Sequence, residues 1–211
     1  MEPATQAIDA ARLAPGLADP VHGAQSVFRA VLDAMARPGR IVAVPENVLA
    51  AAPPAPLGRA AASVLLTLCD IDTPLWLDRR TQAGAADYLR FHCGVPLAAD
   101  PAAARFAMAV EADALPPLDA FDLGSDEYPD RSATLVVEVA GLAAGKSGGT
   151  ALTLSGPGIA GSAALTVDRL PDGFQAQRTA LAPLFPRGLD VVLTCGDRLA
   201  ALPRTTRAEE I

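Results

Sequence analysis

Four turns of the chain carry arginine side chains that could bind a phosphate or carboxylate group. They hold Arg37 and Arg40, Arg131 beside Ser132, Arg187 in the stretch FPRGLD, and Arg204 and Arg207 in LPRTTR. A guanidinium group presents forked N–H donors that match pairs of phosphate oxygens, and the hydroxyl groups of Ser132, Thr205 and Thr206 could add further donors. If these turns meet in one cleft, they form an anion-binding site. Alternatively, each arginine is a solvated loop residue or pairs with a carboxylate across a subunit interface.

The segment GPGI is a second candidate for anion binding, through backbone N–H groups at Gly156 and Gly158. Pro157 has no N–H group, so the segment offers fewer donors than a P-loop. Neither G-x-x-x-x-G-K-[ST] nor a helix-opening G-x-G-x-x-G occurs in the chain. The structural alternative for GPGI is a bulge or tight turn after a strand.

Residues for acid–base or metal chemistry form no recognisable pattern. His22 and His92 are the only histidines, and no cysteine or carboxylate near them has metal-ligand spacing. His92 is a candidate site residue, although a cation at a helix end also complements the helix dipole. Asp190, which ends the FPRGLD stretch, is a further candidate. We expect no catalytic residue in this chain and no bound metal.

Pyridoxal phosphate is the cofactor that the lysine content argues against. It binds its enzymes through a Schiff base to a lysine, and the only lysine is Lys146, between glycines in GKSGG. A catalytic lysine needs rigid surroundings. The sequence therefore predicts no pyridoxal phosphate, and it indicates no other cofactor.

Composition indicates one compact domain in the cytoplasm. The chain has 211 residues, of which 51% are hydrophobic and 19% charged. A net charge of −7 argues against nucleic acid or an anionic membrane as a partner. Three scattered cysteines suggest free thiols in a reducing compartment. We find no signal peptide and no apolar run of the roughly 20 residues that a membrane span needs.

The turn at Arg37 and Arg40 must be positioned by a helix over residues 20–36 and a strand over 40–45. Asp19 can cap this helix, and Pro20 suits its first turn. We predict that its packed face consists of the residues that recur at spacings of three and four, namely Val21, Gln25, Phe28, Leu32 and Met35. Pro38 and Gly39 then end the helix.

The rest of the chain predicts further helices over 57–68, 82–92 and 174–184, and strands over 73–77, 106–110, 134–139, 151–154, 165–167, 189–194 and 199–202. Helices and strands alternate early, whereas strands cluster late. This order favours an α/β fold with three layers around a mixed sheet. Residues 1–18 are predicted to form an N-terminal arm, and residues 19–211 a single domain.

Six of these stretches together resemble a known family. DPVHGAQSVFRAVLDAMARPGRI, LRFHCGVPL, YPDRSATL, LTLSGPGI, FPRGLDVVL and ALPRTTR, in that order, are similar to the PhnH family, whose members are subunits of the bacterial carbon–phosphorus lyase system. The resemblance runs from about residue 17 to residue 207. It implies a fold similar to that of pyridoxal-phosphate-dependent transferases, without the cofactor. It also implies a homodimer when isolated and, in cells, a core complex with subunits G, I and J.

The resemblance further implies that the complex attaches an alkylphosphonate to the ribose C1 of ATP and releases adenine, with no established chemistry on the PhnH component itself. Two hypotheses follow. In the first, the chain is an assembly subunit whose apolar surface binds a second copy and subunit I most directly. In the second, it binds a phosphonate or nucleotide in a cleft formed by the arginine turns, with GPGI at the rim.

Overall fold

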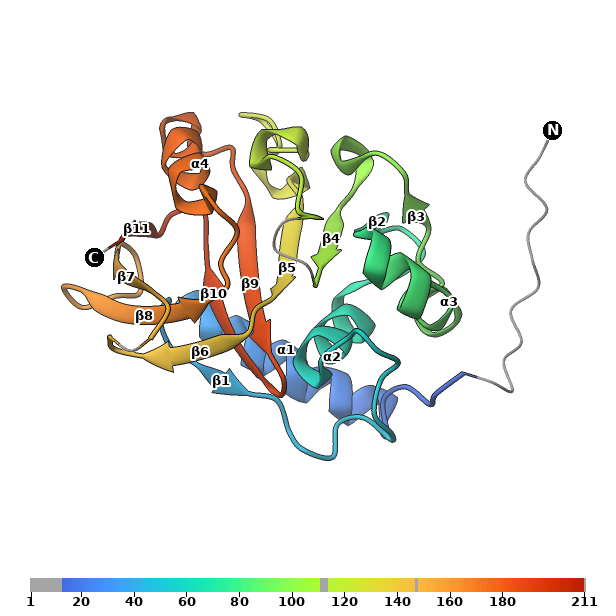
Figure 1. Ribbon diagram of the computed structural model, residues 1–211. Coiled ribbons are helices and arrows are strands. Elements are labelled where there is room, and N and C mark those ends of the chain that lie inside the picture. Colours follow the sequence, from blue (N-terminus) through green and yellow to red (C-terminus); the bar gives the residue numbers. More distant parts are fainter. Residues whose placement is uncertain (1–12, 111–113, 147, 211) are drawn as a thin grey trace.

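A seven-stranded mixed sheet forms the centre of the protein (Figure 1). The computed structural model describes residues 13–110, 114–146 and 148–210. The strand order is β1-β10-β9-β5-β4-β2-β3, and the five strands β9, β5, β4, β2 and β3 run parallel. The bounds are β1 Val42–Ala43, β2 Leu75–Leu77, β3 Leu97–Ala98, β4 Phe106–Ala109, β5 Thr134–Glu138, β9 Asp190–Cys195 and β10 Arg198–Leu202.

A four-stranded antiparallel sheet, in the order β11-β7-β8-β6, packs on the central sheet. Its strands are β6 Gly141–Ala144, β7 Thr150–Ser155, β8 Ala163–Asp168 and β11 Arg207–Glu210. The helices are α1 Pro20–Ala36, α2 Arg59–Leu68, α3 Arg79–Cys93 and α4 Phe174–Leu181, and the short 3₁₀ turn η6 (Ala182–Leu184) follows α4. The mixed α/β architecture predicted from the sequence is therefore present.

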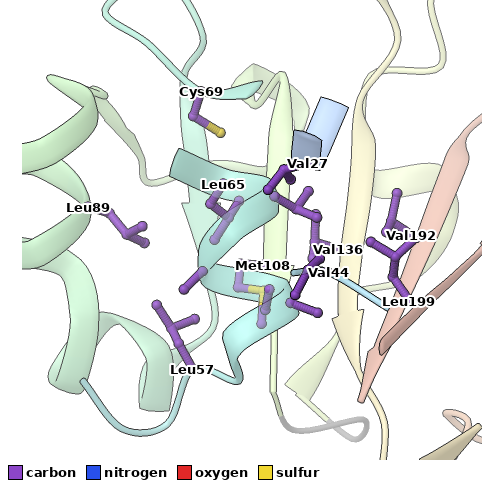
Figure 2. Close-up of a cluster of buried hydrophobic side chains, with 14 of the residues drawn as sticks. Val27, Val44, Leu57, Leu65, Cys69, Leu89, Met108, Val136, Val192 and Leu199 are labelled. Carbon is purple, nitrogen blue, oxygen red and sulfur yellow. The ribbon is translucent and has the colours of Figure 1, made fainter. Parts of the chain in front are cut away.

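Alternating side chains of the central strands supply two separate cores. Val136 and Val192 point to the face covered by α1 and α2, where they belong to one core cluster with Leu65 and Met108; in Figure 2, Val192 lies next to Leu199. Their chain neighbours, such as Leu135, point to the opposite face and pack against the second sheet. Because successive residues of a strand face opposite sides, one sheet can be buried on both faces. The layers are thus helices, central sheet and second sheet.

Helix α1 has the predicted bounds but a different packed face. Asp19 caps it, since its Oδ1 accepts the N–H groups of Val21 and His22 at 3.0 and 2.9 Å. The predicted face is wrong, because Val21, Phe28 and Leu32 are 62%, 52% and 56% exposed. The buried residues are Val27, Ala30, Val31 and Ala34. They also recur at spacings of three and four, and their smaller side chains allow close packing on α2 and β10.

Three strands differ from the sequence-based expectation, and the predicted arm stays a prediction. Strands β3, β6 and β11 were not predicted, since β3 has two residues and β6 and β11 are rich in glycine, alanine or charge. Most of the predicted arm, residues 1–12, lies outside the described residues. Where the structure describes it, Ala14 accepts a hydrogen bond from the His92 ring at 3.0 Å.

The GPGI segment closes tightly on the end of α1. Gly158 has φ +81°, and a Cβ there would collide with the carbonyl oxygen of Ala36. Gly161 in the same loop has a similar φ of +79°, but no atom lies within 4 Å of the position of its Cβ. A comparison of alanine substitutions at the two positions therefore distinguishes the cost of backbone strain, which both share, from the cost of steric overlap, which only Gly158 has.

We expect Gly158→Ala to destabilise the protein more than Gly161→Ala. Both variants incur the cost of a left-handed residue, about 1–2 kcal/mol, and only Gly158→Ala adds a steric overlap, which costs about 1–3 kcal/mol more. Urea unfolding of the two variants measures the difference. Equal losses of unfolding free energy would show that the contact with α1 does not constrain this loop.

Candidate functional site

Arg204 and Asp190 form the best-connected ion pair of the predicted site. The Nε of Arg204 lies 3.3 and 3.2 Å from the two carboxylate oxygens, and Nη2 lies 2.6 Å from Oδ2. The backbone N–H of Arg204 also donates to Asp190 Oδ1 at 2.8 Å. The two side chains are only 16% and 19% exposed. Asp190 begins β9, so this pair ties the segment after β10 to the start of the neighbouring strand.

The remaining donors of Arg204 reach two other segments. Nη1 donates to the carbonyl oxygens of Pro129 at 2.7 Å and Pro186 at 3.3 Å. Nη2 donates to Ser132 Oγ at 2.6 Å. Every N–H-bearing nitrogen of the guanidinium group therefore has a protein partner, and Arg204 joins the loop before β5 to the turn before β9.

Arg131 and Arg187 flank this ion pair, each with a partner of its own. The Arg187 Nε lies 3.3 Å from Asp126 Oδ1, and the Arg131 guanidinium carbon lies 4.0 Å from the centre of the Tyr128 ring. Arg187 and Arg204 share a small hollow of about 20 Å³. That volume holds about one water molecule, so it is too small for an organic ligand.

Arg37 and Arg40 contact a different carboxylate, that of Asp33 on α1. Arg37 forms an ion pair with one oxygen of Asp33, and the Nε of Arg40 lies 3.3 Å from the other. Gly158 packs on the end of the same helix, whereas a Cβ at Gly156 would approach the Thr205 carbonyl to 2.9 Å. GPGI thus lies between the two arginine groups.

The predicted residues therefore fall into groups rather than one cleft. Ser132, Asp190, Arg187 and Arg204 come together before β5 and β9, with Arg131 next to Ser132 in the chain but turned to Tyr128. Arg37 and Arg40 lie at the end of α1. His92 belongs to neither group. Its ring packs against Tyr88, with centroids 4.7 Å apart, and contacts the segment before α1. A role for any of these residues in ligand binding stays a prediction.

Arg178 is the arginine that the sequence reasoning missed. Its Nη1 and Nη2 donate to the carbonyl oxygens of Leu202, Pro203 and Thr206 at 3.3, 3.0 and 3.2 Å. Burial lowers the pKa of Arg178 to about 10, and the nearby charge of Asp190 opposes this shift. The available signal was its position three residues after Gln175 on a predicted helix, which places both on one helical face.

Glu138 is a partly buried carboxylate at the opposite edge of the sheet, where β5 ends. Its Oε2 accepts from Thr194 Oγ1 at 2.6 Å, and Oε1 accepts from the Gly196 N–H at 3.1 Å. Burial raises the pKa of Glu138, and the two hydrogen bonds oppose the shift. Gly58 leaves the space that the carboxylate occupies, since a Cβ there would collide with it.

The three cysteines are free thiols. They are Cys69, Cys93 and Cys195, and burial raises the pKa of Cys93 to about 12. Within the described ranges, no three His, Cys, Asp or Glu side chains gather closely enough to hold a metal ion. No helix in that part of the chain is long and apolar enough to span a bilayer.

We expect Arg204→Lys to lower the unfolding free energy by about 2 kcal/mol, because an ammonium group cannot replace the forked contacts to Asp190, Ser132 and Pro129. The matched variant Arg131→Lys changes an exposed side chain, so its effect should stay within about 0.5 kcal/mol. Chemical denaturation of both variants measures this difference. Similar effects would mean that the Arg204 contacts add little stability.

The raised pKa of Glu138 predicts a pH-dependent stability. Folding favours the protonated carboxyl, so the folded state holds more protons than the unfolded state between the two pKa values. The stabilisation that the protonated Glu138 carboxyl gives the folded state is fully present below the pKa that Glu138 has in the unfolded state. It is lost as the pH rises through the pKa of Glu138 in the folded state. The unfolding free energy of the wild type relative to Glu138→Gln should therefore fall with rising pH and then level off. A difference independent of pH would contradict the prediction.

Comparison with known proteins places the chain in a family. The family model described as bacterial phosphonate metabolism protein (PhnH) matches residues 15–209. The PhnH subunit of alpha-D-ribose 1-methylphosphonate 5-triphosphate synthase from Rhizobium meliloti (strain 1021) is 46% identical over 193 residues, which cover 91% of this chain and 93% of that protein. The putative C-P lyase subunit protein HtxG from Stutzerimonas stutzeri is 34% identical over 185 residues, covering 86% and 84%. The chain therefore belongs to the PhnH family of bacterial phosphonate metabolism proteins.

Proposed function

We propose that this chain is a subunit of the carbon–phosphorus lyase complex, which degrades organic phosphonates. Its role is to support the synthase reaction that transfers an alkylphosphonate to the ribose C1 of ATP and releases adenine. The family match and the two relatives, one named as a ribose 1-methylphosphonate 5-triphosphate synthase subunit and one as a putative C-P lyase subunit, support this proposal. The subunit acts by assembly and is not catalytic alone.

The exposed side of α1 is the observation that carries the assembly role. Val21, Phe28 and Leu32 are all more than half exposed and follow one another at helical spacing. Such a row of large apolar side chains favours a protein partner, because burying each one removes apolar surface from water. The pairing of Arg37, Arg40, Arg187 and Arg204 with carboxylates also fits an assembly role better than a preformed anion site.

The partners we propose are a second copy of the chain when isolated, and subunits G, I and J in the cytoplasmic complex, with subunit I as the most direct contact. The exposed apolar row on α1, Val21, Phe28 and Leu32, supports the homodimer because it can pack against the same row of a second copy. If two α1 helices pack antiparallel about a two-fold axis, Val21 faces Leu32 of the partner subunit, and Gln25 faces Phe28 of the partner subunit. One surface patch then serves both copies, as a two-fold interface requires.

We also propose that the central sheet is related to that of pyridoxal-phosphate-dependent transferases, without the cofactor. The parallel strands β2, β4, β5 and β9 support this relation. Lys146 lies exposed in the turn between β6 and β7. A lysine there has no rigid surroundings to hold a Schiff base.

The double variant Phe28→Ser/Leu32→Ser tests the assembly role. We expect it to elute as a monomer where the wild type is a dimer, and to recover at least tenfold less of a tagged subunit I in co-purification. Both side chains are exposed, so the melting temperature of a monomer should barely change. Light scattering after gel filtration and quantified co-purification measure the two effects.

Ile71→Ser is the matched control, because Ile71 is a large apolar residue that is 70% exposed outside α1. It should leave both the dimer and the binding of subunit I intact. If the α1 double variant behaves like this control in both measurements, α1 is not the assembly surface. If the wild type also fails to bind subunit I, the assembly role itself is wrong.

A further inference from the structure

A groove between α4, η6 and β11 takes in two parts of the predicted arginine cleft, the LPRTTR turn and the GPGI segment, but none of Arg40, Arg131 and Arg187. Its volume is about 640 Å³, which is typical of a pocket for a small organic ligand. We call it the α4–β11 groove. Pro157 of the GPGI segment lines it on one side, and Gln175, Arg178 and Thr206 line it on the other.

Two side chains that line this groove each carry a deeply buried polar atom with no hydrogen-bond partner within the described residues. These atoms are Gln175 Oε1 and Thr206 Oγ1, in side chains that are 7% and 5% exposed. The Gln175 amide is held in place because its Nε2 donates to the Ala208 carbonyl at 2.5 Å. Its oxygen is therefore left as an acceptor that faces no protein donor. Buried polar groups without partners cost free energy, so such atoms indicate where a ligand binds.

The charge of the groove favours an anion. The Arg178 guanidinium is fixed by three backbone carbonyls and contributes a positive charge, which the nearby carboxylate of Asp190, itself paired with Arg204, balances only in part. The Arg207 side chain is exposed and has neither a hydrogen bond nor an ion pair to the described part of the chain. Against these, Glu209 is the one acidic side chain among the lining residues. In a chain with net charge −7, this is a locally cationic site.

The walls of the groove are apolar and suit a flat ring. Pro183 and Ala182 of η6 lie beside Phe185, which is 64% exposed. Pro157 and Ala208 complete the apolar lining. An exposed aromatic ring beside prolines offers a surface on which a heterocycle can stack.

We propose that the α4–β11 groove binds a nucleoside phosphate. The base stacks on Phe185, an N–H or O–H group of the nucleoside donates to Gln175 Oε1, and Thr206 Oγ1 bonds to a second polar atom. The phosphate binds Arg207. This site goes beyond the assembly role and does not depend on it, since no residue that lines the groove belongs to α1.

AMP binding to the purified full-length chain tests this site, with adenosine and inorganic phosphate as separate probes. We expect millimolar AMP to raise the melting temperature more than either probe alone, because only AMP contacts both the Phe185 ring, through its base, and the Arg207 side chain, through its phosphate. Thr206→Val should weaken AMP binding roughly 3- to 10-fold in calorimetry, the effect of one hydrogen bond. It should not lower the melting temperature without ligand, since the hydroxyl has no protein partner.

Arg207→Gln should weaken AMP binding roughly tenfold and leave adenosine binding unchanged, because it removes a charge-assisted contact to the phosphate alone. Arg198→Gln is the matched control, as Arg198 is exposed on β10 and does not line the groove. Absence of any AMP-dependent shift would overturn the proposal. So would equal AMP affinity in the wild type, Thr206→Val and Arg207→Gln, or a shift that inorganic phosphate alone reproduces.

Discussion

The contact between Arg204 and Asp190 connects segments that the chain order keeps far apart. A buried ion pair is favourable only when further hydrogen bonds complete it, because both charges lose their water. Here the carboxylate also accepts the backbone N–H of Arg204, and the guanidinium donates to Ser132, Pro129 and Pro186. The start of β9, the loop before β5 and the segment after β10 are thus held in one arrangement, on which the α4–β11 groove depends.

The chain that continues from Arg204 into β11 is fixed by a second set of polar contacts, from α4. Gln175 and Arg178 donate to the carbonyl oxygens of Ala208 and Thr206. These carbonyls belong to β11 and the residue before it, and β11 is an edge strand, paired with β7 alone. Covering an edge with side-chain donors prevents it from pairing with another strand. The same contacts leave Gln175 Oε1 free, so protection of the edge and the polar character of the groove have one structural cause.

Helix α1 meets two demands with two separate sides. Its small buried side, with Val27, Ala30 and Ala34, lets the helix approach the sheet and α2 closely. Its large apolar side, with Phe28 and Leu32, gains nothing from the fold of one chain, because it remains exposed. Large apolar residues that do not stabilise the monomer fit the proposed assembly role, because association with a partner would bury them. Periodicity alone indicates two apolar stripes and does not say which of them packs inside.

Local rules in the sequence determined the bounds of α1, its Asp19 cap and the position of the parallel strands, since these depend on neighbours along the chain. The family resemblance also followed from the sequence, because it rests on residues in order. Tertiary structure alone decided that Arg204 meets Asp190 and Ser132, that Arg37 and Arg40 instead meet Asp33, and that Gln175 and Thr206 share a groove. The physical reason is that these contacts depend on side-chain geometry, which follows from how the two sheets, α1 and α4 pack.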